Sequence, residues 1–275
     1  MLIACTPETT VIEVSTTLPQ AAALNSLQTT LEDEDNDTTI INENRCQTPS
    51  PADAQSCAAL EEQILASTVR IELHRWQEAE GKRGEHIDGG IGHATVKDGR
   101  YLVTHNHFPM SLDSIEGLAG EQIRITIYKA DGEVIIESVQ SSAFTIVFED
   151  SETVVLDFGE YVGEGLFAML GIPSAEFYNW QTVSLAPGME VAQINWDNET
   201  AHVEWVNIKS VLTFNGTPQI ELDKEVIKGA SGGGVFWNGI HIGNNWKNTT
   251  VQAVNDGAIL EAFSTAALNS EWVNG

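Results

Sequence analysis

The run Lys228-Gly229-Ala230-Ser231-Gly232-Gly233-Gly234-Val235-Phe236 places one serine among four glycines. A tight turn of such residues can present the oxygen of Ser231 outward while the N–H groups of Gly229 and Ser231 converge on one point. Convergent N–H groups stabilise the negatively charged oxygen of a tetrahedral intermediate. A flexible glycine turn with an incidental serine is the alternative explanation, so the meaning of this run depends on the rest of the sequence.

A second element lies upstream of this run and reads Tyr101-Leu102-Val103-Thr104-His105-Asn106-His107-Phe108. The two elements together resemble the chymotrypsin-like (trypsin-like) serine peptidase family. In that family the nucleophile lies in Gly-x-Ser-Gly-Gly, and the general base ends a strand of the type Thr-Ala-Ala-His. Matching position by position puts Thr104 on the threonine and His107 on the base.

The resemblance implies that Ser231 is the nucleophile, that His107 is the general base, and that the N–H groups of Gly229 and Ser231 form the oxyanion hole. His105 and Asn106 replace the family's two alanines, so the packing around them must differ. His105 is also a rival base.

The family places its third catalytic residue, an aspartate, just before a strand of the type Asp-Ile-Ala-Leu-Leu. The matching stretch here is Glu152-Thr153-Val154-Val155-Leu156, which puts Glu152 in that role. A glutamate can orient a histidine, although its extra methylene needs a different approach. Asp150 lies two residues earlier on the same strand face and is the alternative, and Asp157 on the opposite face is the third choice.

The order of these residues along the chain separates two folds. Gly229–Gly233 also satisfies the Gly-x-Ser-x-Gly pattern of α/β-hydrolases, which need serine, then acid, then histidine. The only histidine after Ser231 is His241, which precedes Asp256, and no alternation of strands with long helices is present. The order histidine, acid, serine therefore favours the chymotrypsin-like arrangement.

Short strands dominate the pattern from residue 66 onward, with turns such as Lys97-Asp98-Gly99 between them. Two groups of about six strands predict an all-β fold of antiparallel barrels or sandwiches. The resemblance implies two six-stranded antiparallel β-barrels, with the catalytic groups in the cleft between them. The first barrel is expected at about 66–165 and the second at about 186–255. Short helices are expected at 58–65 and, at the C-terminal end, at 258–268.

Residues 1–57 are rich in polar and acidic residues and read as a disordered tether, followed by a peptidase domain at 58–275. Leu2-Ile3-Ala4-Cys5 resembles the bacterial lipobox, which implies lipidation at Cys5 and a location at the cell surface. Cys46 and Cys57 flank a Pro- and Ser-containing loop and are candidates for a local disulfide, which needs an oxidising compartment.

The charge of the chain argues against nucleic acid and anionic lipid as partners. Forty acidic and 13 basic side chains give a net charge of −27, which repels nucleic acid and anionic lipid headgroups. The resemblance implies a polypeptide substrate and no metal or organic cofactor. We expect membrane contact only through a lipid anchor at Cys5, and the sequence does not predict an oligomeric state.

The resemblance also offers a specificity residue and a rival function. In trypsin-type members an acid six residues before the nucleophile lies at the base of the primary pocket, and Glu225 occupies that position here. It predicts a preference for Lys or Arg at the cleaved bond. The rival function is a catalytically silent binding module with the same fold, and a surface adhesion protein with a coincidental serine run is a more distant alternative.

Overall fold

The computed structural model describes nine stretches of the chain, all in the larger of two units, residues 42–275. The described stretches are 45–80, 82–106, 121–140, 143–149, 153–177, 185–197, 199–214, 217–247 and 250–253. The sequence predictions for Cys5, His107, Asp150, Glu152 and the helix at 258–268 lie outside the described residues.

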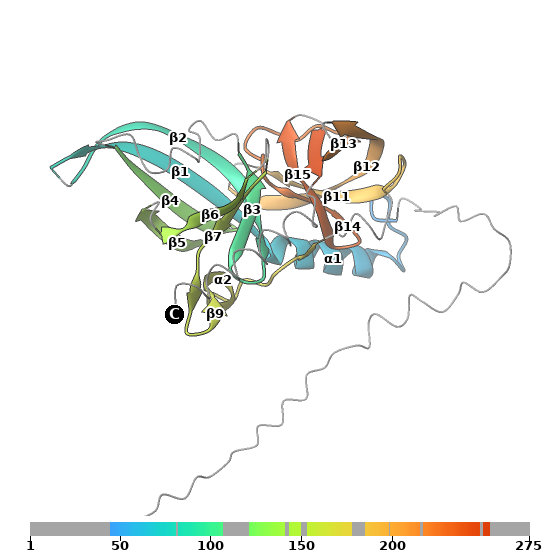
Figure 1. Cartoon of the computed structure of the whole chain (residues 1–275). Helices are drawn as coiled ribbons and strands as arrows, with labels where there is room; N and C mark the ends of the chain where they lie inside the picture. The colour runs from blue at the N-terminus through green and yellow to red at the C-terminus, as the bar shows by residue number, and fades with distance from the viewer. Residues whose placement is uncertain are drawn as a thin grey trace, which may run out of the picture. The chain divides into compact units, whose positions relative to one another are not determined.

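The first sheet has seven strands that are antiparallel to their neighbours, in the order β5-β4-β1-β2-β3-β7-β6. Two of them, β1 and β2, are the long curved strands of Figure 1. The bounds are β1 Thr68–Ala79, β2 Lys82–Lys97, β3 Tyr101–His105, β4 Glu121–Lys129, β5 Val134–Gln140, β6 Thr145–Glu149 and β7 Thr153–Asp157.

The second sheet closes into a ring. Its order is β10-β15-β14-β11-β12-β13-β16, and an additional ladder pairs β16 with β15, so six strands form a barrel to which β10 adds a short parallel strand. The bounds are β10 Glu176–Phe177, β11 Glu190–Trp196, β12 Ala201–Phe214, β13 Thr217–Leu222, β14 Gly234–Trp237, β15 Ile240–Lys247 and β16 Thr250–Ala253.

The remaining elements are short. Helix α1 spans Ala54–Ala66 and helix α2 spans Leu166–Met169, and β8 (Glu160–Tyr161) pairs with β9 (Glu164–Gly165). No helix among the described residues is both long and apolar enough to cross a membrane. The predicted all-β, chymotrypsin-like fold class is confirmed, with one strand more than the six expected in the first sheet.

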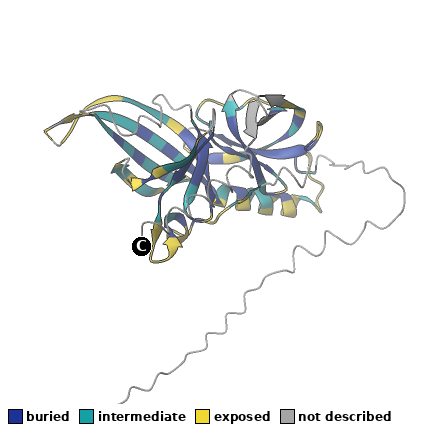
Figure 2. Ribbon diagram, viewed as in Figure 1, coloured by how far each residue is buried: buried dark blue, intermediate teal, exposed yellow. Residues whose placement is uncertain are grey.

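Each sheet has its own hydrophobic core. In β1 and β4 apolar side chains alternate with polar ones, so that one face of each strand is buried. In β4 the fully or nearly buried residues are Ile123, Ile125 and Ile127, and the residues between them are only partly buried. Strand β11 is buried along its whole length and β7 at every position except Asp157. Figure 2 shows buried residues in dark blue. The first core packs residues of β1–β7 around Leu156 and Phe167, and the second packs residues of β11–β15 around Val191 and Ile208.

Residues before 58, where the peptidase domain is expected to begin, already have a described structure, and helix α1 starts at Ala54. Cys46 and Cys57 form a disulfide. The buried carboxylate of Glu190 accepts hydrogen bonds from the N–H of Cys46 at 2.8 Å and of Gln47 at 2.7 Å. These contacts fix a segment that has no hydrophobic pattern of its own.

The disulfide gives a prediction about stability. Replacing Cys46 and Cys57 by serine should lower the free energy of unfolding by about 2–3 kcal/mol, because an 11-residue loop is no longer closed in the unfolded chain. The melting temperature should fall by roughly 5–10 °C. Calorimetry of both proteins measures this change, and equal melting temperatures would show that the segment adds nothing to stability.

Candidate active site

Two tight turns in tandem carry Ser231. The N–H of Ala230 donates to the carbonyl of Ile227 at 3.2 Å, and the N–H of Gly233 donates to the carbonyl of Ala230 at 3.0 Å. The third residue of each turn is a glycine with positive φ, +98° at Gly229 and +77° at Gly232. This is the pattern of type II turns, which need glycine at that position. Ser231 is therefore the second residue of the second turn, with its two neighbouring peptides fixed.

The turn at Gly232 packs directly on the first sheet. A Cβ at Gly232 would lie 2.3 Å from both the carbonyl oxygen of His93 and the hydroxyl of Thr104. That hydroxyl donates to the same His93 carbonyl at 2.6 Å. Gly232 thus marks the point where the second barrel contacts β2 and β3, and its glycine is required by space as well as by conformation. This argues against the explanation of the run as a merely flexible turn.

His93, in β2, holds the serine turn through two hydrogen bonds. Its backbone N–H donates to the carbonyl of Ser231 at 2.8 Å, and its ring Nδ1 contacts the carbonyl of Gly229 at 3.0 Å. A carbonyl only accepts, so Nδ1 carries the proton. Burial lowers the pKa of His93 to about 4, and the ring is therefore neutral at neutral pH.

Trp196, the last residue of β11, contacts the same turn from the second barrel. Its indole Nε1 donates to the carbonyl of Lys228 at 2.9 Å. A Cβ at Gly229 would lie 2.6–2.8 Å from atoms of this indole ring. The indole and the His93 ring also meet edge to face, with their centroids 5.7 Å apart.

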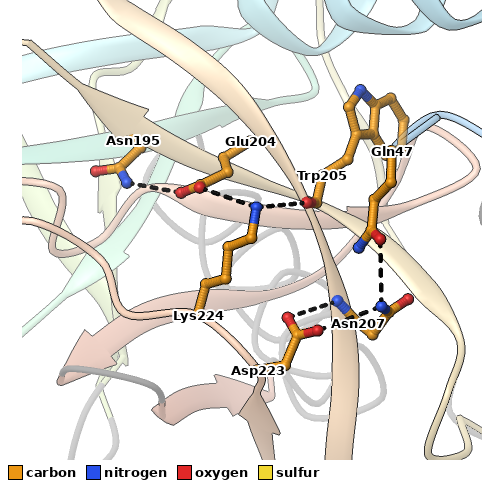
Figure 3. A network of polar contacts seen from close by, with 7 residues as sticks. All are labelled: Gln47, Asn195, Glu204, Trp205, Asn207, Asp223 and Lys224. Carbon is orange, nitrogen blue, oxygen red and sulfur yellow. Dashed lines mark hydrogen bonds and ion pairs between the residues drawn. The ribbon is translucent and has the colours of Figure 1, made fainter.

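The segment that leads into the first turn is fastened to β11 and β12 by a polar network (Figure 3). The side chain of Asn195 donates to Glu204 at 3.1 Å, and its oxygen accepts the N–H of Ile227 at 3.2 Å. Lys224 donates to the same Glu204 at 3.2 Å. The carboxylate of Asp223 accepts hydrogen bonds from the backbone N–H of Asn207 at 2.9 Å and from its side-chain amide at 3.2 Å. The start of the nucleophile turn is thereby fixed relative to the barrel.

A pocket of about 690 Å³ opens beside Ser231. Both barrels line it, and its walls include His105 from β3 and Trp196 and Lys228 from the second barrel. His105 is almost completely buried and its ring packs against Gly232. The remaining lining residues are His74, His86, Gly89, Gly90, Ile91 and Gly229.

The end of the first sheet beside this pocket joins the two chain segments that lead to the predicted base and acid. The ladder between β3 and β7 pairs His105 with Thr153. The side chain of Asn106 donates a hydrogen bond to Glu149. His107 follows Asn106 in the sequence, Asp150 follows Glu149, and Glu152 precedes Thr153.

Two other predicted acids have clear positions. Asp157 pairs with Tyr101 at the opposite end of the same ladder, and its carboxylate accepts two hydrogen bonds of 2.6 Å from Arg100. Asp157 is therefore a structural ion-pair partner. Glu225 is exposed and is not among the residues that line the pocket.

Neither Trp196 nor His93 belongs to a motif from which the site was predicted. The sequence signal for both is slight, because each touches the turn through the fold and not through a motif. No cluster of histidine, cysteine or carboxylate side chains in the described part of the chain could hold a metal ion.

Taken together, the sheets and the serine turn define the fold of the chymotrypsin-like serine proteases. Among solved structures, Deg5 superposes with a TM-score of 0.53 at 16% sequence identity, over 77% of this chain and 94% of Deg5. At that identity the match establishes the fold.

Two further solved structures resemble the chain. The HtrA-type protease AlgW with a decapeptide gives a TM-score of 0.49 at 15% identity, over 78% of this chain and 67% of AlgW. The Rv3671c protease in an inactive form gives 0.46 at 16% identity, over 79% of this chain and 96% of the other. No protein-family model and no curated protein matches the sequence.

The contacts of Gly232 predict the effect of one added methyl group. Gly232→Ala should destabilise the protein by at least about 2 kcal/mol more than Gly188→Ala, because both positions have positive φ but only Gly232 lacks space for a Cβ. The Gly188 variant is the matched control and should cost about 1–2 kcal/mol. Urea unfolding measures both, and equal losses would mean that the contact with β2 and β3 does not constrain the turn.

Proposed function

We propose that the chain is a serine endopeptidase in which Ser231 is the nucleophile and His107 is the general base. Glu152 or Asp150 orients the histidine, and the N–H groups of Gly229 and Ser231 form the oxyanion hole. The observation that carries the proposal is the pair of type II turns around Ser231, held against β2 and β3 beside a pocket. A rigid turn of this kind can aim N–H donors before the substrate arrives.

The ladder between β3 and β7 supports the proposed base and acid. It pairs His105 with Thr153 and so brings the segments that lead to His107 and Glu152 to one end of the sheet. The hydrogen bond between Asn106 and Glu149 joins the same segments. The order histidine, acid, serine along the chain agrees with the fold.

The proposed chemistry is acyl transfer to water. His107 removes the proton of the Ser231 hydroxyl as its oxygen attacks the peptide carbonyl, and the new oxyanion accepts hydrogen bonds from the N–H groups of Gly229 and Ser231. The protonated histidine then donates that proton to the leaving amine. Water attacks the acyl-enzyme by the same route and restores the serine.

The alternative function is a catalytically silent binding module. Such a module would not need four positions around the serine that only glycine fits. It would also not need a Gly229 N–H that has no acceptor among the described residues. Here a Cβ would clash at Gly229, Gly232, Gly233 and Gly234. The N–H of Gly229 donates to no group among the described residues. Both features favour an active site.

Labelling by a fluorophosphonate probe tests the function. The wild-type protein should form one covalent adduct at Ser231, because only an activated serine attacks the probe. Ser231→Ala should abolish labelling, while Ser56→Ala, on the exposed face of α1, should leave it unchanged. An unlabelled wild-type protein of native stability would favour the silent module.

The same assay distinguishes His107 from His105 as the base, and Glu152 from Asp150 as the acid. His107→Ala should lower the labelling rate at least about 1,000-fold, whereas His105→Ala should keep more than a tenth of it. A reversed result would make His105 the base. Of Glu152→Gln and Asp150→Asn, the variant with the larger loss identifies the acid that orients the histidine.

Specificity gives a further prediction. If Glu225 selects basic residues, a peptide library should show enrichment of Lys or Arg at the cleaved bond, and Glu225→Gln should remove it. The described ionisable residues of the pocket are instead His74, His86, His105 and Lys228. Enrichment of Asp or Glu that disappears in Lys228→Gln would therefore show that this pocket, and not Glu225, selects the substrate.

We also propose that the protein acts outside the cytoplasm, on polypeptide substrates. The Cys46–Cys57 disulfide supports an oxidising compartment. The lipobox-like Leu2-Ile3-Ala4-Cys5 supports a lipid anchor on the cell surface. Metabolic labelling with a palmitate analogue that is lost in Cys5→Ser tests the anchor.

A further inference from the structure

We infer that Trp196 and His93 are positioning residues that together fix the two peptide groups on either side of Gly229, and so aim the N–H of Gly229 as an oxyanion-hole donor. This inference rests on the proposed function for its catalytic meaning. Its structural part can be tested separately, because it concerns only the orientation of the two peptide groups on either side of Gly229.

The peptide group between Lys228 and Gly229 is the part of the turn that most needs support. Type I and type II turns differ mainly by a flip of their central peptide, and in the turn from Ile227 to Ala230 that peptide joins Lys228 to Gly229. Glycine itself adopts positive and negative φ with similar ease. The backbone of the turn alone therefore does not choose which way the N–H of Gly229 points.

The indole of Trp196 makes this choice. In a trans peptide the C=O and the N–H point in opposite directions. The hydrogen bond of 2.9 Å from Nε1 of Trp196 to the carbonyl of Lys228 holds that oxygen toward the indole. The N–H of Gly229 must then point away from the indole, and it donates to no group among the described residues.

His93 fixes the next peptide group. Its Nδ1–H donates to the carbonyl of Gly229 at 3.0 Å, while the N–H of Ala230 in the same peptide donates to Ile227 at 3.2 Å. The backbone N–H of His93 also holds the carbonyl of Ser231. One residue of β2 therefore sets the position of the donor glycine and of the nucleophile together.

The surroundings of both rings restrict their movement. Trp196 is 7% exposed and His93 is fully buried, and the two rings contact each other. The guanidinium of Arg70, a residue of β1, lies 5.7 Å from the centroid of the Trp196 ring and 4.0 Å from the ring centroid of Tyr128. Trp196 and His93, which we call the clamp, are thus supported by residues of β1, β2, β4 and β11.

The matched variants are Trp196→Phe and Trp205→Phe. Both keep an aromatic ring and lose one indole N–H, but the Nε1 of Trp205 donates to Glu61 of α1, away from the serine turn. Trp196→Phe should lower the rate of fluorophosphonate labelling about 10- to 100-fold, less than the 10²- to 10³-fold typical of losing a whole oxyanion donor. The KM for a peptide substrate should stay within twofold, because the lost interaction acts in the transition state.

His93→Phe should give a loss of similar size. The double variant with Trp196→Phe should lose less than the product of the two single effects, since both residues act on the same glycine. The inference is overturned if Trp196→Phe labels within twofold of wild type, or if Trp205→Phe loses as much.

A measurement without catalysis separates this inference from the proposed function. The amide signal of Gly229 in the NMR spectrum of the wild-type protein should be single and should shift, broaden or double in Trp196→Phe, while Trp205→Phe leaves it unchanged. If wild type does not react with the probe but the Gly229 signal responds in this way, the proposed activity is wrong and the clamp stands. An unchanged Gly229 signal in Trp196→Phe overturns the clamp in either case.

Discussion

The hydrogen bond from the N–H of His93 to the carbonyl of Ser231 joins the two sheets at the proposed nucleophile. Around it, Gly232 packs against the His93 carbonyl and the Thr104 hydroxyl without space for a side chain. A buried backbone group must find a partner within the protein. The contact therefore holds the serine turn against β2 and β3, and the other contacts of the turn are arranged around this position.

The tight packing of the turn explains why it carries so many glycines. Each tight contact with β2, β3 or β11 requires a residue without a Cβ, and two of these residues also adopt positive φ. Gly229 and Ser231 also line the pocket, together with Trp196 and His105. A turn that is held by such contacts and borders a pocket suits preorganised catalysis, in which the donors are aimed before the reaction begins.

The sequence was sufficient for the fold class and for most strands. The alternation in β4 and the apolar run in β7 follow directly from burial on one or both faces. The outer halves of β1 and β2 carry no such pattern. They contain charged and glycine residues, and they form strands because they pair with each other, for example through Arg75 and Asp88.

The candidate site was predictable only where a local motif reports it. Ser231 and Gly229 lie in such a motif, and the turns bear out its physical interpretation as a constrained turn. Trp196 acts on a carbonyl 32 residues away, and His93 on one 136 residues away. Contacts of that separation depend on how the barrels pack, which no local pattern in one sequence encodes. The same reason applies to Cys46, whose N–H is bonded by Glu190 from 144 residues away.

We propose that Ser231 forms an acyl-enzyme in a turn that is already arranged for it. Stopped-flow mixing of the protein with excess p-nitrophenyl ester tests this proposal. An acyl-enzyme at Ser231 should give a rapid burst of about one equivalent of p-nitrophenol per protein, followed by slower steady release, because acylation precedes deacylation on the same serine. Linear release without a burst, at a rate that Ser231→Ala reproduces, would contradict it.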